Sequence, residues 1–143
     1  MFLLLKLPSA YFSGVRIVSL TTDRAVVSVP FKWFSQNPFK STYFACLAMA
    51  AELSTGLPAM MQCYKRKPAV SMLVTKMEAH YFKKAKGLTF FSCDGGKDFE
   101  HIVEECIRED RAMTYVATAV GRNEQDEKVA EFFITWSFKV KAG

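Results

Sequence analysis

The longest apolar stretch of the chain extends from residue 41 to residue 64 and leaves no polar face. Its only acidic or basic side chain is Glu52. Because residues 43–53 are good helix formers or are tolerated in helices, the pattern predicts a long helix that is buried on nearly all sides. Ser41 or Thr42 is the expected N-cap of this helix.

A membrane span is the alternative for this stretch, since about 20 apolar residues are enough to cross a bilayer. The charge of Glu52 and the helix breakers Gly56 and Pro58 argue against a span, and the uninterrupted apolar part, residues 43–51, is too short. We expect Gly56 and Pro58 to end or bend the helix. The sequence therefore predicts a helix at the centre of a soluble domain and no membrane span.

Stretches that are rich in β-branched residues or that alternate between apolar and polar predict strands on both sides of this helix. The six predicted strands cover residues 15–20, 24–31, 70–82, 86–93, 111–120 and 130–140. The last is the clearest, because every second side chain from Phe132 to Val140 is apolar. Residues 2–12 predict a short helix or helical turns, interrupted by Pro8, and residues 98–107 predict an amphipathic surface helix.

Six strands joined largely by short turns indicate one antiparallel sheet. A helix that is apolar on all sides needs more cover than one flat face provides. We therefore predict an α+β fold in which a curved six-stranded antiparallel sheet wraps around the long central helix, with the amphipathic helix added at the surface. The length of 143 residues fits a single domain, residues 1–143.

Composition narrows the possible functions. Half of the residues are hydrophobic and 13 are Phe, which predicts that apolar surface is hidden in an oligomer. The net charge of +5 is spread over short runs, which fits a phosphate-bearing ligand better than nucleic acid. The four cysteines are neither closely paired nor at metal-ligand spacing from a His, so we expect reduced thiols and no metal. The first residues do not resemble a secretory signal, which predicts a cytoplasmic protein.

Glu52 is the principal candidate for a functional residue. A buried, unpaired carboxylate costs several kcal/mol, so the residue requires a partner or a task. One interpretation is a catalytic or ligand-binding acid. The other is a structural Glu at a subunit interface, held by hydroxyls and backbone amides.

Two segments carry a resemblance to a known superfamily. The sequence NPFKSTYF of residues 37–44 leads into the central helix, and YFKKAKG of residues 81–87 forms a strand end and a basic turn. Together with the order of elements, they resemble the hotdog-fold superfamily, and most closely an uncharacterised branch allied to acyl-CoA thioesterases of the phenylacetate-pathway type. Ser41 stands where those enzymes have a loop Thr, and Glu52 stands where they have the acid that acts on the thioester.

The resemblance implies a set of site residues. Glu52 would be the general base or the nucleophile, the backbone N–H groups of Phe44 and Ala45 would hold the oxyanion, and Asn37 would orient the water or the carbonyl. Substrate contacts are expected at Ser41, Tyr43, Thr55, Lys83 and Lys84. The two lysines would meet the phosphates of coenzyme A. The alternatives are that Asn37 only forms a turn and that the lysines are only solvated surface.

The chain departs from the family at the start of the central helix, where Tyr43, Phe44 and Ala45 stand in place of His-Gly-Gly. This leaves no imidazole there, and the added Cβ atoms narrow the approach to the helix N-terminus. Two functions follow. One is an acyl-CoA thioesterase that takes a coenzyme A thioester as substrate and needs no cofactor. The other is a non-catalytic hotdog module that binds an acyl group or another apolar ligand, with Glu52 structural at the interface. Both predict a homodimer or a homotetramer.

Overall fold

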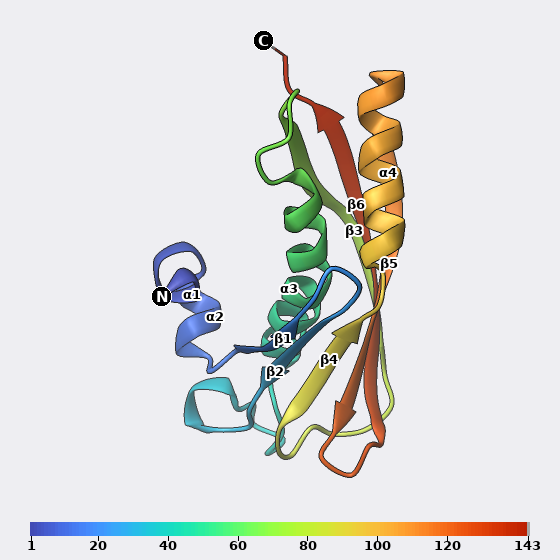
Figure 1. Cartoon of the computed structure of the whole chain (residues 1–143). Coiled ribbons are helices and arrows are strands. Elements are labelled where there is room, and N and C mark those ends of the chain that lie inside the picture. Colours follow the sequence, from blue (N-terminus) through green and yellow to red (C-terminus); the bar gives the residue numbers. More distant parts are fainter. Residues whose placement is uncertain (143) are drawn as a thin grey trace.

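The computed structural model describes residues 1–142 and contains one sheet with helices on its inner side (Figure 1). The helices are α1 (Phe2–Lys6), α2 (Pro8–Phe12), a 3-10 turn η1 (Trp33–Ser35), α3 (Phe44–Cys63) and α4 (Gly96–Glu109). The strands are β1 (Arg16–Leu20), β2 (Ala25–Val29), β3 (Val70–Tyr81), β4 (Thr89–Cys93), β5 (Met113–Asn123) and β6 (Lys128–Val140). Element types and order agree with the sequence prediction.

All neighbouring strands of the sheet are antiparallel, in the order β1-β2-β4-β5-β6-β3. The first and last strands of this order, β1 and β3, are therefore its two edges. The long β3 pairs with β6 along its whole length, from Val70 opposite Val140 to Tyr81 opposite Ala130. Its other side carries unpaired backbone groups, which can pair with another strand.

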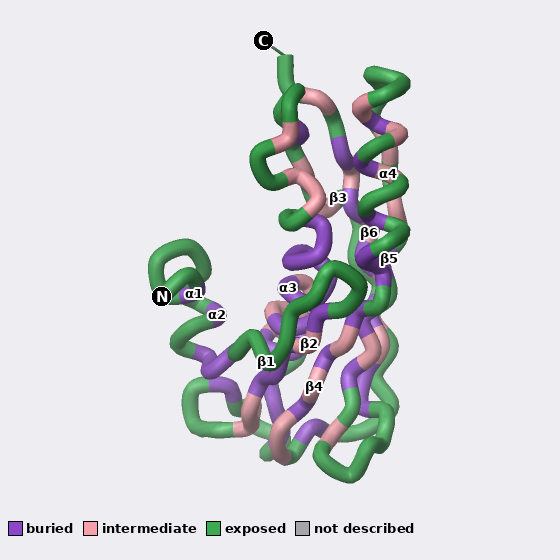
Figure 2. Tube along the Cα trace, in the orientation of Figure 1, coloured by how far each residue is buried: buried purple, intermediate pink, exposed green. Residues whose placement is uncertain are grey.

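The central helix α3 packs against the inner face of the sheet, and its middle is buried (Figure 2). The alternating side chains of β6 supply part of that inner face, with Phe132, Ile134, Trp136 and Phe138 all buried. The indole Nε1 of Trp136 donates a hydrogen bond of 2.9 Å to Thr55 Oγ1 on α3. This arrangement of curved sheet and central helix is the hotdog fold that the resemblance predicts.

The amphipathic helix α4 packs beside α3 and against β5 and β6. Its apolar stripe, Phe99, Val103 and Cys106, is fully buried, as its spacing predicts. The ring of Phe99 packs edge-on against Tyr115 and Phe138 of these two strands. At its start, Gly96 lies so close to the β1–β2 turn that a Cβ would fall 1.9 Å from the carbonyl oxygen of Thr22.

Two predictions about α3 were wrong, namely that Gly56 and Pro58 end the helix and that Ser41 or Thr42 caps it. The helix continues through Gly56 and Pro58 to Cys63, because the free energy gained by burying this segment exceeds the cost of the hydrogen bond that Pro58 removes. A bend at these residues stays a prediction. Neither Ser41 nor Thr42 is its N-cap: the helix begins at Phe44, and the N-cap residue is Tyr43, which forms no side-chain cap hydrogen bond. The hydroxyl of Thr42 instead donates to the carbonyl oxygen of Ala85, at 3.2 Å.

By length and composition alone, α3 would suffice to cross a membrane. In the folded chain, however, 61% of its most apolar window is buried. Such burial is typical of the core helix of a globular fold.

Candidate functional site

A pocket of about 620 Å³ lies at the N-terminus of α3. One wall is the loop that precedes the helix, and the other is the segment that follows β3. The lining includes six residues proposed from the sequence, namely Asn37, Ser41, Tyr43, Phe44, Lys83 and Lys84. The fold therefore joins the two segments that carry the family resemblance, residues 37–44 and 81–87.

Asn37 holds the loop together. Its Oδ1 accepts hydrogen bonds from the backbone N–H of Phe39, at 2.9 Å, and of Ser41, at 3.2 Å. Its Nδ2 donates to Ser41 Oγ at 3.1 Å. These contacts are those of a turn-forming Asn, and they also occupy the hydroxyl of Ser41. A role of either side chain in orienting water or substrate stays a prediction.

The first turn of α3 leaves its backbone donors without a side-chain cap. In an α-helix the N–H groups of the first residues have no partner within the helix, and the dipole makes this end positive. Here those residues are Phe44 and Ala45, and Phe44 lines the pocket. The helix N-terminus can therefore polarise a carbonyl oxygen, although the side chain of Phe44, 58% exposed, stands beside the approach.

Glu52 lies on the same helix but outside this pocket. It lines an open apolar cavity of about 350 Å³ between α1, α3 and β6, with Phe2, Leu53, Met60 and Trp136 in its walls. No ion pair or side-chain hydrogen bond holds its carboxylate within residues 1–142. Burial raises the pKa of Glu52 above its ordinary value of 4.5. An acid with this environment retains its proton to higher pH than an exposed Glu.

Thr55 faces the sheet and is fully buried. Its hydroxyl donates to the backbone carbonyl of Glu52, at 2.9 Å, and accepts the hydrogen bond from Trp136. Both bonds are structural and fix this turn of the helix to β6. A substrate contact of Thr55, which was proposed from the sequence, stays a prediction, and it would have to replace one of them.

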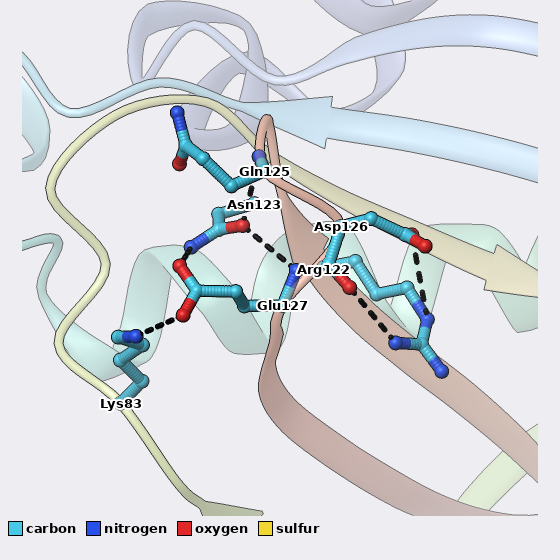
Figure 3. Close-up of polar contacts among 6 residues, drawn as sticks. All are labelled: Lys83, Arg122, Asn123, Gln125, Asp126 and Glu127. Atoms are coloured by element: carbon cyan, nitrogen blue, oxygen red, sulfur yellow. Dashed lines mark hydrogen bonds and ion pairs between the residues drawn. The ribbon is translucent and has the colours of Figure 1, made fainter.

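The two lysines of the basic turn differ in their surroundings, and Figure 3 shows those of Lys83. Lys83 forms an ion pair with Glu127, which also accepts a hydrogen bond from Asn123 Nδ2 at 3.0 Å. This pairing with Lys83 and Asn123 lowers the pKa of the Glu127 carboxyl. Lys84 has no carboxylate partner within residues 1–142, and its Nζ lies 3.5 Å from the carbonyl oxygen of Phe39 at the pocket. Lys84 is thus the better candidate for a phosphate contact.

Sequence reasoning did not identify Lys6 as a neighbour of Glu52. Lys6 of α1 lines both cavities that Glu52 lines, the larger with Phe2 and Leu7 and a smaller one of about 170 Å³ with Leu7 and Met49. Its position as the only charge among residues 1–15 was the one available signal. Nothing in the pattern showed that α1 and the middle of α3 would line the same cavity.

The pocket and Glu52 are separate sites within one chain. Ala45 and Glu52 are seven positions apart, and a helix rises about 1.5 Å per residue, so about 10 Å of helix axis lies between them. A carbonyl oxygen bound at the helix N-terminus is therefore beyond the reach of the Glu52 carboxylate of the same chain.

The antiparallel sheet and its central helix define a hotdog-fold protein. The solved structures most like it include a Pseudomonas aeruginosa protein of unknown function, described as a probable thioesterase, with a TM-score of 0.83 and 19% identity over 98% of this chain and 93% of that one. The chain belongs to the family described as a domain of unknown function, DUF4442, which matches residues 2–138.

Two further solved structures share the fold. A Chlorobaculum tepidum protein of unknown function has a TM-score of 0.83 at 15% identity, and the match covers 98% of this chain and 91% of that one. A thioesterase from Haemophilus influenzae has a TM-score of 0.69 at 10% identity, and the match covers 96% of this chain and 86% of that one. No functionally curated protein matches the sequence.

Proposed function

We propose that this protein is an acyl-CoA thioesterase in which the side chain of Glu52 is the catalytic carboxylate. The observation that carries the proposal is the half-buried Glu52 carboxylate, which lines an apolar cavity and has no partner within residues 1–142. The uncapped N-terminus of α3 supplies a second element, a place for the developing oxyanion. Other proteins that share the fold are named thioesterases.

Glu52 would act as general base. It removes a proton from water, the water oxygen attacks the thioester carbonyl, and the oxyanion forms beside the N–H groups of Phe44 and Ala45. Collapse of this intermediate breaks the C–S bond, and Glu52 returns its proton to the leaving thiolate. A raised pKa suits this role, because it makes the carboxylate a stronger base near neutral pH. The alternative is direct attack by the carboxylate on the carbonyl, followed by hydrolysis of the anhydride.

We further propose that the site is shared between two chains. Since one chain keeps Glu52 and the helix N-terminus about 10 Å apart, Glu52 of one protomer would act on a carbonyl held by the helix of its partner. The surface around these elements is unusually apolar, with Phe44, Leu73 and Phe82 each more than half exposed. The edge strand β3 ends at Tyr81, which lines the pocket.

The first prediction concerns assembly. We expect a homodimer, or a tetramer made of two dimers, in sedimentation velocity at micromolar concentration. The double substitution Leu73→Glu with Met77→Glu on the edge strand β3 should shift the protein toward monomer, because like charges on an edge strand oppose its pairing with a second copy. Glu at Val116, equally exposed but on the central strand β5, is the matched control and should leave the assembly intact. A stable wild-type monomer would contradict the shared site.

The second prediction concerns coenzyme A. We expect Lys84→Ala to weaken coenzyme A binding severalfold at low ionic strength and much less at high, because salt screens an exposed charge pair. Lys83→Ala should have a smaller effect, since Glu127 already neutralises Lys83. Isothermal titration at two salt concentrations measures both. Equal losses for the two variants, or a loss that is independent of salt, would argue against a phosphate site at Lys84.

A panel of acyl-CoA substrates with released thiol as the readout tests the function itself. We expect turnover of at least one acyl chain that fits the apolar cavity. The alternative function, a non-catalytic module that binds an apolar ligand, is favoured by the side chains of Tyr43 and Phe44 at the helix start, both largely exposed. Binding of acyl-CoA without release of thiol would support that alternative.

A further inference from the structure

The N-terminal part of the chain forms an apolar surface that no other element within residues 1–142 covers. Met1 and Leu5 of the first helical turns, Phe12 of α2, and Trp33 and Phe34 of η1 are each more than half exposed, Trp33 at 81%. We call these five residues the N-terminal surface. Helices α1 and α2 and the loop that follows β2 both stand out from the sheet on one side of the molecule (Figure 1). They are neighbours, because Gly14 lies against Pro30 and Lys32.

A pocket of about 520 Å³ opens within this region. Its apolar walls include Phe2, Tyr11, Phe12 and Ile17, and its polar side is formed by Arg16 and Lys32. Neither cation has an ion-pair partner within residues 1–142, whereas four of the other five arginines are paired. The pocket therefore offers two free cations beside aromatic rings, a combination that suits an anionic head group with an apolar tail.

The net charge of this part of the chain is positive. Residues 1–51 contain five basic residues and a single acid, Asp23, so they hold most of the net charge of +5. Asp23 lies on the β1–β2 turn, where its carbonyl oxygen accepts a hydrogen bond from Gly96 at the start of α4. Apart from the half-buried Glu52, which shares a cavity with Phe2 and Lys6, the charged side chains at the apolar N-terminal surface are thus cations.

We propose that the N-terminal surface docks on the surface of an anionic lipid bilayer. Arg16 and Lys32 would contact lipid phosphates, Met1, Leu5 and Phe12 would enter the boundary of the acyl chains, and Trp33 would lie at head-group level, where Trp is favoured in membranes. The excess of basic residues in residues 1–51 favours an anionic bilayer over a protein partner of mixed charge. This proposal concerns attachment and does not depend on thioesterase activity.

Vesicle binding tests the proposal, and the two tryptophans make it measurable by fluorescence. Trp33 is exposed and Trp136 is 5% exposed, so a change on adding vesicles reports on Trp33. We expect a blue shift and cosedimentation with phosphatidylcholine vesicles that contain phosphatidylglycerol, both reduced by salt, and little binding to phosphatidylcholine alone. Trp33→Phe should abolish the shift and keep most of the binding.

The matched variants separate this surface from a general effect of positive charge. Each basic residue near an anionic surface contributes about 1 kcal/mol, so Arg16→Gln with Lys32→Gln should weaken vesicle binding about 30-fold. Lys139→Gln with Lys141→Gln removes the same charge at the other end of the chain and should change binding little. The proposal is overturned if anionic vesicles do not bind at low salt, if both double variants lose binding equally, or if the Arg16 and Lys32 variant splits an oligomer, which would make the surface a contact between copies.

Discussion

Glu52→Gln is expected to lower the thioesterase rate by about 10² to 10⁴, the usual contribution of a general base, while the fold is retained. Gln has nearly the same size and keeps the hydrogen-bonding capacity but cannot accept the proton of water. The same residue predicts the pH dependence: because burial raises the pKa of Glu52, the rate of the wild-type protein should fall on the acid side with a midpoint above 4.5. Release of thiol as a function of pH measures both effects.

The stability of this variant distinguishes a catalytic Glu from a structural one. A raised pKa means that the folded chain favours the protonated acid, so its contribution to stability is full below the ordinary pKa and is lost as pH rises through the raised pKa. A neutral Gln avoids this loss, and the variant should melt at or above the wild-type temperature at pH 7. A lower melting temperature would indicate a carboxylate with a structural partner.

Glu105→Gln is the control for this experiment. Glu105 is a half-buried acid on α4, where its contact is His101, at 3.5 Å on the surface. We expect the wild-type rate from this variant. A fall in rate similar to that of Glu52→Gln would mean that the assay reports a general effect of lost charge.

Phe44→Pro is expected to lower the rate by about 10² to 10³, because it removes one backbone N–H from the proposed oxyanion site. Proline is well tolerated at the first position of a helix, where the N–H has no partner within the helix. The preceding residue, Tyr43, has φ −60° and ψ 136°, an extended conformation that proline allows. The variant should therefore fold.

Phe44→Ala removes the same ring and keeps the N–H, so the ratio of the two rates isolates the backbone donor. We expect Phe44→Ala to retain most of the activity, or to gain some, because the ring that narrows the approach is gone. Equal rates for the Pro and Ala variants would exclude the Phe44 N–H from the mechanism.

The fold could be predicted from the sequence because its strongest signals are long and unambiguous. The apolar residues 43–53 predict a helix that is buried on all sides, and the alternating side chains of β6 predict a strand with one buried face. Together they indicate a sheet that wraps around a helix. The N-cap could not be predicted. The hydroxyl of Thr42 bonds to the carbonyl of Ala85, 43 positions away, and no local pattern reveals such a contact.

The candidate site was predictable only in part for the same reason. Residues 37–44 and 81–87, the two segments that carry the family resemblance, meet at one pocket. The pairing of Lys83 with Glu127, and the cavity that Lys6 of α1 lines together with Glu52, join positions more than 40 residues apart. The structure also separates two neighbouring candidates on α3, because it turns Thr55 toward Trp136 and leaves Glu52 half-buried at an apolar cavity.

The shared active site is tested most directly with a purified heterodimer of two inactive chains. Glu52→Gln and Phe44→Pro chains, carrying different affinity tags, are expressed together and the mixed dimer is isolated. If Glu52 of one chain acts with the helix N-terminus of the other, this dimer contains one complete site out of two, and we expect about half of the wild-type rate. A mixed dimer as inactive as its two parents would contradict the account, since it would place Glu52 and the oxyanion donor in the same chain or remove one of them from the reaction.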